Sequence, residues 1–164
     1  MTRLTSAPVP GVGSEDHARG EGAEAIGYLD LACPHCAVTW SRVTSLGLRL
    51  VFRHFPVASK HPRAPALHAA AEAAGIQGGE DAFWQLVDSV YEDRGRVDDP
   101  HLWQRARDLG LDLDRFESER RSDAVARRIR HDFEAGIRAG VTGTPAFFVG
   151  GDRADEDNLR SLAL

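Results

Sequence analysis

Apolar and polar positions divide the chain into strand-like segments at both ends and a long helical stretch between them. Residues 25–31 form a short, mostly apolar run, and residues 48–53 alternate apolar with charged side chains, so both segments are expected to be strands. Pro34 lies between them at a position typical of a first helical residue, which predicts a helix from residue 34 to about 45. Strand, helix and strand with short connections indicate a βαβ unit whose strands run parallel.

Residues 62–139 are almost entirely helical in pattern, because apolar side chains recur there at spacings of three and four. Ser122 is expected to cap the last of about four helices, and Gly140 to end it. The buried stripe predicted for that helix consists of Val125, Ile129, Phe133 and Ile137. After it, residues 146–149 predict another strand, Gly150-Gly151 a turn and residues 155–162 a terminal helix.

This order of elements predicts an α/β, thioredoxin-like fold in which a helical insertion separates two halves. We expect a single domain over residues 23–164, with its core in residues 23–56 and 141–164 and the insertion in residues 62–139. Residues 1–22 are rich in proline, glycine, serine and charge, and they offer no periodic apolar face. They are therefore interpreted as a flexible N-terminal arm.

Composition narrows the classes of function. The 164 residues are 42% hydrophobic and 27% charged, which is typical of a globular protein. The net charge is −5 and the arginines are dispersed among acids, so no nucleic-acid partner is expected. Neither an apolar run of about 20 residues nor the apolar core of a secretory signal is visible. We therefore expect no membrane insertion and a cytoplasmic location.

The chain has only two cysteines, Cys33 and Cys36, which are too few for a disulfide framework or a zinc site of four cysteines. A Cys-x-x-Cys pair beside a βαβ pattern indicates a redox motif. Cys33 falls where a strand ends and a helix begins, so free backbone N–H groups and the helix dipole favour its thiolate. Cys36 lies one helical turn further, within reach of a disulfide, and His35 adds a hydrogen-bond donor or a positive charge. The two sulfurs hold the electrons, so no cofactor is expected.

Gly143-Thr144-Pro145 immediately precedes the strand predicted at residues 146–149. Proline suits the first position of a strand because it cannot donate to the strand ladder. In a thioredoxin-like fold a cis-proline at this place faces the active-site disulfide. The backbone of Thr144 is then free to pair with an extended substrate chain, so Thr144 and Pro145 are the candidate substrate-binding residues.

The chain resembles the DsbA-like thioredoxin-domain family, in particular its stand-alone bacterial branch, which is also found fused to sodium–proton antiporters. The resemblance runs in order from about residue 16 to 160. It is carried by Asp16-His17, Gly20, Asp30, Cys33-Pro34-His35-Cys36, Arg53-His54-Phe55-Pro56, His61-Pro62, Ala70-Ala71-Glu72-Ala73-Ala74, Phe83-Trp84, Val141-Thr142-Gly143-Thr144-Pro145 and Phe147-Phe148-Val149. It implies disulfide exchange with protein or small-molecule thiols and a partner that recycles the dithiol. It also implies roles for Cys33 as nucleophile, Cys36 as resolving thiol, His35 in tuning the pair and Pro145 in presenting the substrate. Pro34 completes the catalytic motif between the two cysteines.

Three features depart from the family pattern. The buried acid that many relatives carry six residues before the first cysteine is replaced by Gly27, and Asp30 is the candidate for part of its proton-transfer role. Residues 150–154 leave little room for the usual edge strand in the β-β-α half of the fold. Most disulfide-forming relatives are exported, whereas a cytosolic location favours a reductase, an isomerase or a stress-responsive thiol enzyme.

The seven histidines form no H-E-x-x-H motif, and no metal site is predicted from them. His68, His101 and His131 are expected at the surface or as caps. His54 and His61 follow the second strand, where they either approach the thiols or pack in a loop.

Two other functions compete with thiol–disulfide exchange. A metal-handling module would bind Cu(I) or Zn(II) through Cys33, Cys36 and a nearby histidine, although the tight turn favours a disulfide. A non-catalytic binding domain would use the helical insertion and the edge at Thr144-Pro145, but such a domain has no use for a reactive thiolate.

Overall fold

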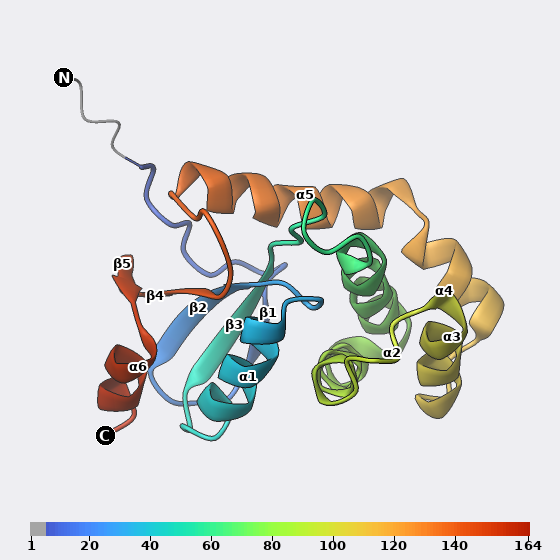
Figure 1. Ribbon diagram of the computed structural model, residues 1–164, viewed down its shortest axis with the longest axis horizontal. Coiled ribbons are helices and arrows are strands. Elements are labelled where there is room, and N and C mark those ends of the chain that lie inside the picture. The colour runs from blue at the N-terminus through green and yellow to red at the C-terminus, as the bar shows by residue number, and fades with distance from the viewer. Residues whose placement is uncertain (1–5) are drawn as a thin grey trace.

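The computed structural model describes residues 6–164 and contains a five-stranded mixed sheet (Figure 1). Its strands follow the spatial order β1-β3-β2-β4-β5. β2 and β3 are parallel and are joined through helix α1, so the predicted βαβ unit is confirmed, while the other neighbouring pairs are antiparallel. The bounds of these elements are β1 His17–Arg19, β2 Glu24–Leu29, α1 Pro34–Val43, β3 Arg49–His54, β4 Ala146–Val149 and β5 Asp152–Ala154.

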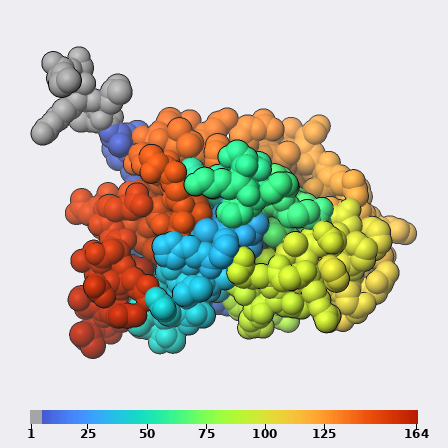
Figure 2. Space-filling model, viewed as in Figure 1, coloured from blue at the N-terminus to red at the C-terminus, as the bar shows by residue number. Residues whose placement is uncertain are grey.

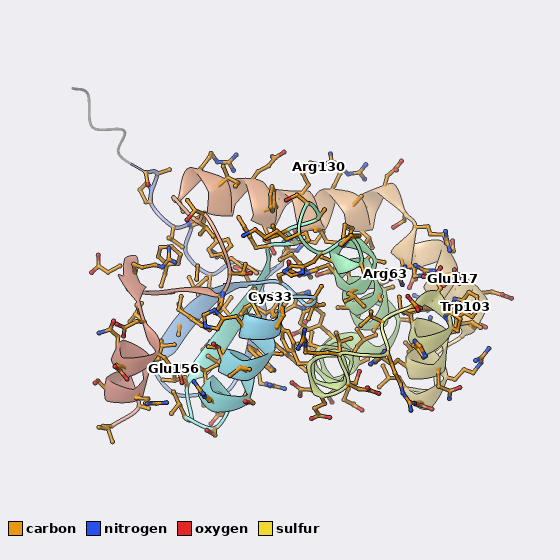
Figure 3. All side chains as sticks on the ribbon, viewed as in Figure 1. Cys33, Arg63, Trp103, Glu117, Arg130 and Glu156 are labelled. Atoms are coloured by element: carbon orange, nitrogen blue, oxygen red, sulfur yellow. The ribbon has the colours of Figure 1, made fainter. Side chains whose placement is uncertain are left out.

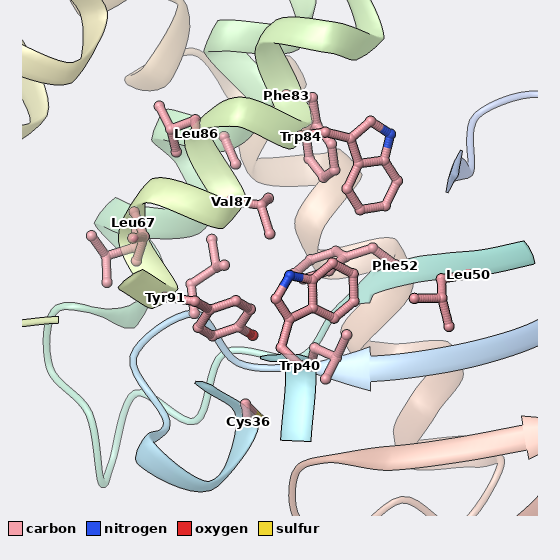
Figure 4. Packing of buried hydrophobic residues seen from close by; sticks show 14 of the residues in the cluster. Cys36, Trp40, Leu50, Phe52, Leu67, Phe83, Trp84, Leu86, Val87 and Tyr91 are labelled. Carbon is pink, nitrogen blue, oxygen red and sulfur yellow. The ribbon is translucent and has the colours of Figure 1, made fainter. Parts of the chain in front are cut away.

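The two faces of the sheet bury separate apolar clusters, because successive side chains of a strand point to opposite faces. Leu29 of β2 and Phe52 of β3 belong to the larger cluster, which also contains residues of α1 and of α2 (Ala64–Glu92). Tyr28 of β2 and Val51 of β3 belong to the smaller one, against which Phe133 of α5 (Asp123–Arg138) packs. Figure 4 shows part of the larger cluster, in which Trp40 of α1 lies against Phe52 of β3 and against Trp84 and Tyr91 of α2.

The helical insertion contains four helices, as predicted: α2 Ala64–Glu92, α3 Asp99–Asp108, α4 Leu113–Arg120 and α5 Asp123–Arg138. Gly79 interrupts α2 with a φ of 78°, a conformation that glycine adopts without steric cost. The Ser122 hydroxyl caps α5 by accepting from the Val125 N–H. The stripe predicted for α5 is wrong at Ile137, which is 52% exposed. Gly136 is buried instead, because the rings of Tyr28 and Phe55 pack directly on it. They lie so close that a Cβ at this position would clash with both rings.

Two corrections concern the ends of the chain. Residues 17–19 of the predicted flexible arm form β1, the edge strand that pairs antiparallel with β3; residues 1–5 lie outside the described part of the chain. Three residues are too few to show an alternating pattern, and this strand is defined by its backbone hydrogen bonds to β3. The segment after β4 does hold an edge strand, because the Gly150-Gly151 turn allows β5 to fold back on β4. The chain then ends in α6, Glu156–Leu162.

No helix within residues 6–164 combines the length and the apolar character that crossing a membrane requires.

Candidate active site

Cys33 is the N-cap residue of α1, immediately after the loop that leaves β2 (Figure 3). Its extended backbone (φ −80°, ψ 123°) turns its sulfur toward the first turn of the helix, where Sγ accepts a hydrogen bond from the Cys36 N–H at 3.4 Å. Pro34 occupies the first helical position, as the sequence predicts. Cys33 is 6% exposed and Cys36 is completely buried, and both are free thiols. The more accessible sulfur is therefore also the one at the positive end of the helix.

The Thr144–Pro145 peptide bond is cis and lies against Cys33, which confirms the predicted placement of the second motif. The Cys33 Sγ is 3.8 Å from the Thr144 carbonyl oxygen, although the two residues are separated by 111 positions. In Figure 2 the segment around residues 30–38, coloured blue, reaches the surface between the green segment that follows β3 and the orange segment that precedes β4. The two motifs thus meet at a surface that another chain can approach.

The two thiols differ strongly in acidity. The pKa of Cys33 is lowered from 9.0 to about 5, chiefly because the Cys36 thiol donates a hydrogen bond to it; burial opposes the shift, and the Cys36 N–H, the Thr144 side chain and the His35 N–H add to it. The pKa of Cys36 is raised, because its proton is shared with Cys33 and because it is buried. The Cys33 thiolate therefore stabilises the reduced fold above its unfolded pKa, and this contribution is lost as the pH falls through about 5.

His35 contributes differently from what the sequence suggests. Its side chain lies exposed at the surface, and its contribution to the lowered pKa of Cys33 comes from the backbone N–H. The backbone of the first helical turn can supply that donor whichever residue stands at this position.

Asp30 lies fully buried behind the cysteines and anchors the active-site loop. Its carboxylate accepts hydrogen bonds from the Ala32 N–H at 2.8 Å and the Val57 N–H at 2.9 Å, and its own N–H donates to Cys36 Sγ at 3.5 Å. Burial raises the pKa of Asp30, but the nearby His68 ring and the hydrogen bonds from these amides outweigh burial and lower it. The carboxylate is thus held ionised by fixed donors, which suits an anchor better than the proton carrier suggested by the sequence.

The space expected for a buried acid at position 27 is filled by the ring of Phe147. Gly27 and Phe147 face each other across β2 and β4. A Cβ on Gly27 would lie 2.8 Å from Phe147 Cε1 and 3.1 Å from Leu29 Cδ1. The glycine is therefore explained by packing, since the aromatic ring occupies the place of an acidic side chain.

Gly27→Glu is expected to destabilise the fold by at least about 2 kcal/mol, because it overpacks the core and buries a carboxyl group. In the double variant Gly27→Glu/Phe147→Ala, part of that cost is relieved, so the two effects are expected to be less than additive. Urea denaturation of the single and double variants measures both quantities. A Gly27→Glu variant as stable as the parent chain would show that Phe147 does not exclude the acid.

Two histidines near the site are buried, and the surface position predicted for His68 is wrong. His68 is fully buried rather than at the surface; its Nε2 accepts from the Leu31 N–H at 3.0 Å, and its Nδ1 lies 2.7 Å from His54 Nδ1. His54 is likewise buried, at the end of β3. The spacing of four between His68 and Glu72 places both on one face of α2, which is the sequence signal that could have revealed the cluster.

Comparisons with known proteins identify the family of the chain. Residues 26–163 match the DSBA-like thioredoxin domain family. A Na(+)/H(+) antiporter NhaA 1 of Salinispora arenicola is 37% identical over 88% of this chain, and an NhaA of Herminiimonas arsenicoxydans is 36% identical over 84%. The chain spans only 23% of the length of either antiporter.

Solved structures show the same fold. Pseudomonas aeruginosa DsbA2 superposes with a TM-score of 0.71 at 26% identity, covering 93% of this chain and 94% of that one. The thiol-disulfide exchange protein alpha-DsbA2 of Wolbachia pipientis superposes with a TM-score of 0.79 at 20% identity, covering 92% and 86%. Because the family model matches most of this chain, the chain belongs to the DSBA-like thioredoxin domain family.

Proposed function

We propose that this protein is a thiol–disulfide oxidoreductase that exchanges electrons with protein thiols through Cys33 and Cys36. The observation that carries the proposal is the environment of Cys33. Its sulfur caps a helix, its pKa is lowered to about 5, and it faces the cis Thr144–Pro145 bond. A thiol with this pKa is largely ionised at neutral pH, and the thiolate is the nucleophile of disulfide exchange.

In the reductive direction, the Cys33 thiolate attacks one sulfur of a substrate disulfide and forms a mixed disulfide, and the other substrate sulfur leaves as a thiolate. Cys36 then loses its proton and attacks Cys33 Sγ. The Cys33–Cys36 disulfide forms, the second substrate thiolate leaves, and the substrate has gained two electrons. The oxidative direction is the reverse, and in either case a partner must recycle the dithiol.

The raised pKa of Cys36 supports this order of events. While Cys33 is a thiolate, Cys36 keeps its proton and donates a hydrogen bond to the Cys33 sulfur. Once Cys33 is bound to substrate it carries no negative charge, so the main cause of the high pKa is removed and Cys36 becomes able to ionise. Cys36 is therefore expected to become a nucleophile only once the mixed disulfide has formed.

The substrate class follows from the edge beside the thiols. The Thr144 backbone next to the cis bond suits pairing with an extended peptide, which favours protein disulfides over isolated small thiols. The metal-handling alternative gains no support, because the cluster of potential metal ligands found among residues 6–164 contains neither cysteine. The cytoplasmic location remains a prediction from the sequence; in a reducing compartment it favours reduction or isomerisation over net disulfide formation.

The proposal is tested by trapping. Cys36→Ser keeps the nucleophile but removes the resolving thiol. This variant is therefore expected to accumulate a mixed disulfide with insulin or with a peptide that contains a disulfide. Non-reducing electrophoresis and mass spectrometry detect the adduct. Cys33→Ser is the matched control and is expected to give none. Equal adduct formation by both variants, or by neither, would contradict the proposed roles.

A further inference from the structure

Three buried side chains from separate elements converge beneath the sheet edge, outside the thiol site. His17 comes from β1, His54 from the end of β3 and Glu72 from α2. The Nε2 atoms of both histidines lie 2.6 Å from the same carboxylate oxygen, Glu72 Oε1. We propose that His17, His54 and Glu72 form a binding site for one divalent transition-metal ion of the Zn²⁺ class, independent of the Cys33–Cys36 dithiol.

The donor set fits such an ion. Two imidazole nitrogens and one carboxylate oxygen are ligands that Zn²⁺ takes, with a fourth position left for water. All three side chains are buried, at 10%, 0% and 9% side-chain exposure for His17, His54 and Glu72. A dication bound there would lie against the Glu72 carboxylate and offset its negative charge.

Each histidine also has a contact at its other ring nitrogen, and a carboxylate there, as at His17, is the usual partner of a metal-ligating imidazole. The Nδ1 of His17 lies 2.7 Å from Glu80 Oε1, and the Nδ1 of His54 lies 2.7 Å from His68 Nδ1. The His17 ring is further fixed by stacking on Phe83, with centroids 3.6 Å apart and an interplanar angle of 9°. Each Nε2 is therefore directed at the common point without a further rearrangement of the rings.

The cluster is accessible from solvent. His17 and Glu72 line a cavity of about 480 Å³ together with Ile76, Arg128 and His131. Arg128 carries a positive charge into this cavity, but it is paired with Asp132 at 2.5 Å and lies 3.9 Å from Asp16. The cavity thus gives an ion an entry path and leaves room for the water that completes its coordination.

Loading requires a small expansion of the cluster. Bond lengths of about 2.0–2.2 Å in tetrahedral geometry place neighbouring ligand atoms roughly 3.3 Å apart, compared with 2.6 Å between nitrogen and oxygen here. Glu72 lies at the cavity wall, where a change in its side-chain torsions supplies the difference.

Metal binding at this site is also expected to change hydrogen bonds of the loop that precedes the cysteines. In this structure the Leu31 N–H donates to His68 Nε2, so His68 carries its proton on Nδ1. A metal on His54 Nε2 places the shared proton on His54 Nδ1, and His68 must then carry its own proton on Nε2, 3.6 Å from Asp30 Oδ1. The Leu31 N–H then loses its acceptor on His68, so the loop must adjust. The metal site is thereby connected through His68 to the anchor of the active-site loop.

The test uses the full chain with Cys33→Ser and Cys36→Ser, in which no thiol can bind metal. Equilibrium dialysis against Zn²⁺ is expected to give one ion per chain. Co²⁺ titration is expected to give visible d–d bands without a thiolate-to-cobalt charge-transfer band. In this background Glu72→Gln removes a ligand charge at nearly constant volume and is expected to weaken Zn²⁺ binding more than about 100-fold, beyond what loss of an orienting residue costs.

Glu80→Gln is expected to weaken binding by about 10–100-fold, because it removes only the residue that orients His17. The Glu80 side chain is 54% exposed, so this variant keeps the test decisive even if Glu72→Gln fails to fold. Glu92→Gln, an exposed position near the end of the same helix, is the matched control and is expected to bind Zn²⁺ as the background chain does. Absence of stoichiometric binding by the background chain, equal binding by the Glu80→Gln variant, or binding that appears only when the cysteines are restored would each overturn the proposal.

Discussion

Replacement of Cys33 by serine is expected to reduce disulfide exchange to the rate of the uncatalysed reaction. Serine has the shape of cysteine, but its hydroxyl does not ionise at neutral pH, so the nucleophile stabilised by the start of α1 and by Cys36 is lost. The measurement is the rate of insulin disulfide reduction in the presence of a thiol reductant, with the variant compared to the parent chain.

A serine at Cys36 provides the comparison for that result. It leaves the first attack possible and blocks resolution, so the variant is expected to lose turnover while its Cys33 still reacts with an alkylating reagent at pH 6. Full turnover in the Cys33→Ser variant would refute the assignment of the nucleophile.

Asp30→Ala is expected to lower the free energy of unfolding by about 2–4 kcal/mol. The substitution leaves the N–H groups of Ala32 and Val57 without their acceptor in a region only partly open to water. Urea denaturation of the reduced protein measures the loss. Because Asp30 joins the loop before Cys33 to the segment after β3, we also expect slower exchange in the variant that remains folded.

Asp30→Asn separates anchoring from proton transfer. The amide keeps one carbonyl oxygen as an acceptor and cannot carry a proton, so an anchor predicts a smaller loss of stability than in Asp30→Ala and a pH profile of exchange that keeps its shape. A profile that loses an ionisation in Asp30→Asn would instead assign proton transfer to Asp30.

Much of the fold could be predicted from local patterns. The apolar run before Cys33, Pro34 at the first helical position and the alternation in residues 48–53 are local signals, and each corresponds to an element of the structure. The same holds for the thiol site, since Cys33-Pro34-His35-Cys36 and Thr144-Pro145 are short motifs whose meeting follows from the fold they predict.

What could not be predicted depends on contacts between distant segments. β1 is recognisable only through its pairing with β3, because three residues carry no periodicity. The reason for Gly27 is a ring 120 positions further along the chain, at Phe147. The burial of His68 and its contact with His54 likewise arise when α2 packs on the sheet, and the ordinary preference of histidine for partly exposed positions predicts the opposite.

The reduction potential of the Cys33–Cys36 pair, measured against glutathione from pH 6 to pH 8, tests the central claim most directly. A pKa of about 5 at Cys33 predicts a potential at pH 7 between about −270 mV, the thioredoxin value, and about −120 mV, the DsbA value, because a stabilised thiolate favours the reduced form. It also predicts a slope of about −30 mV per pH unit, since only one proton is taken up per two electrons while Cys33 stays ionised. Failure to form a Cys33–Cys36 disulfide, or a slope near −59 mV per pH unit over this range, would contradict the account.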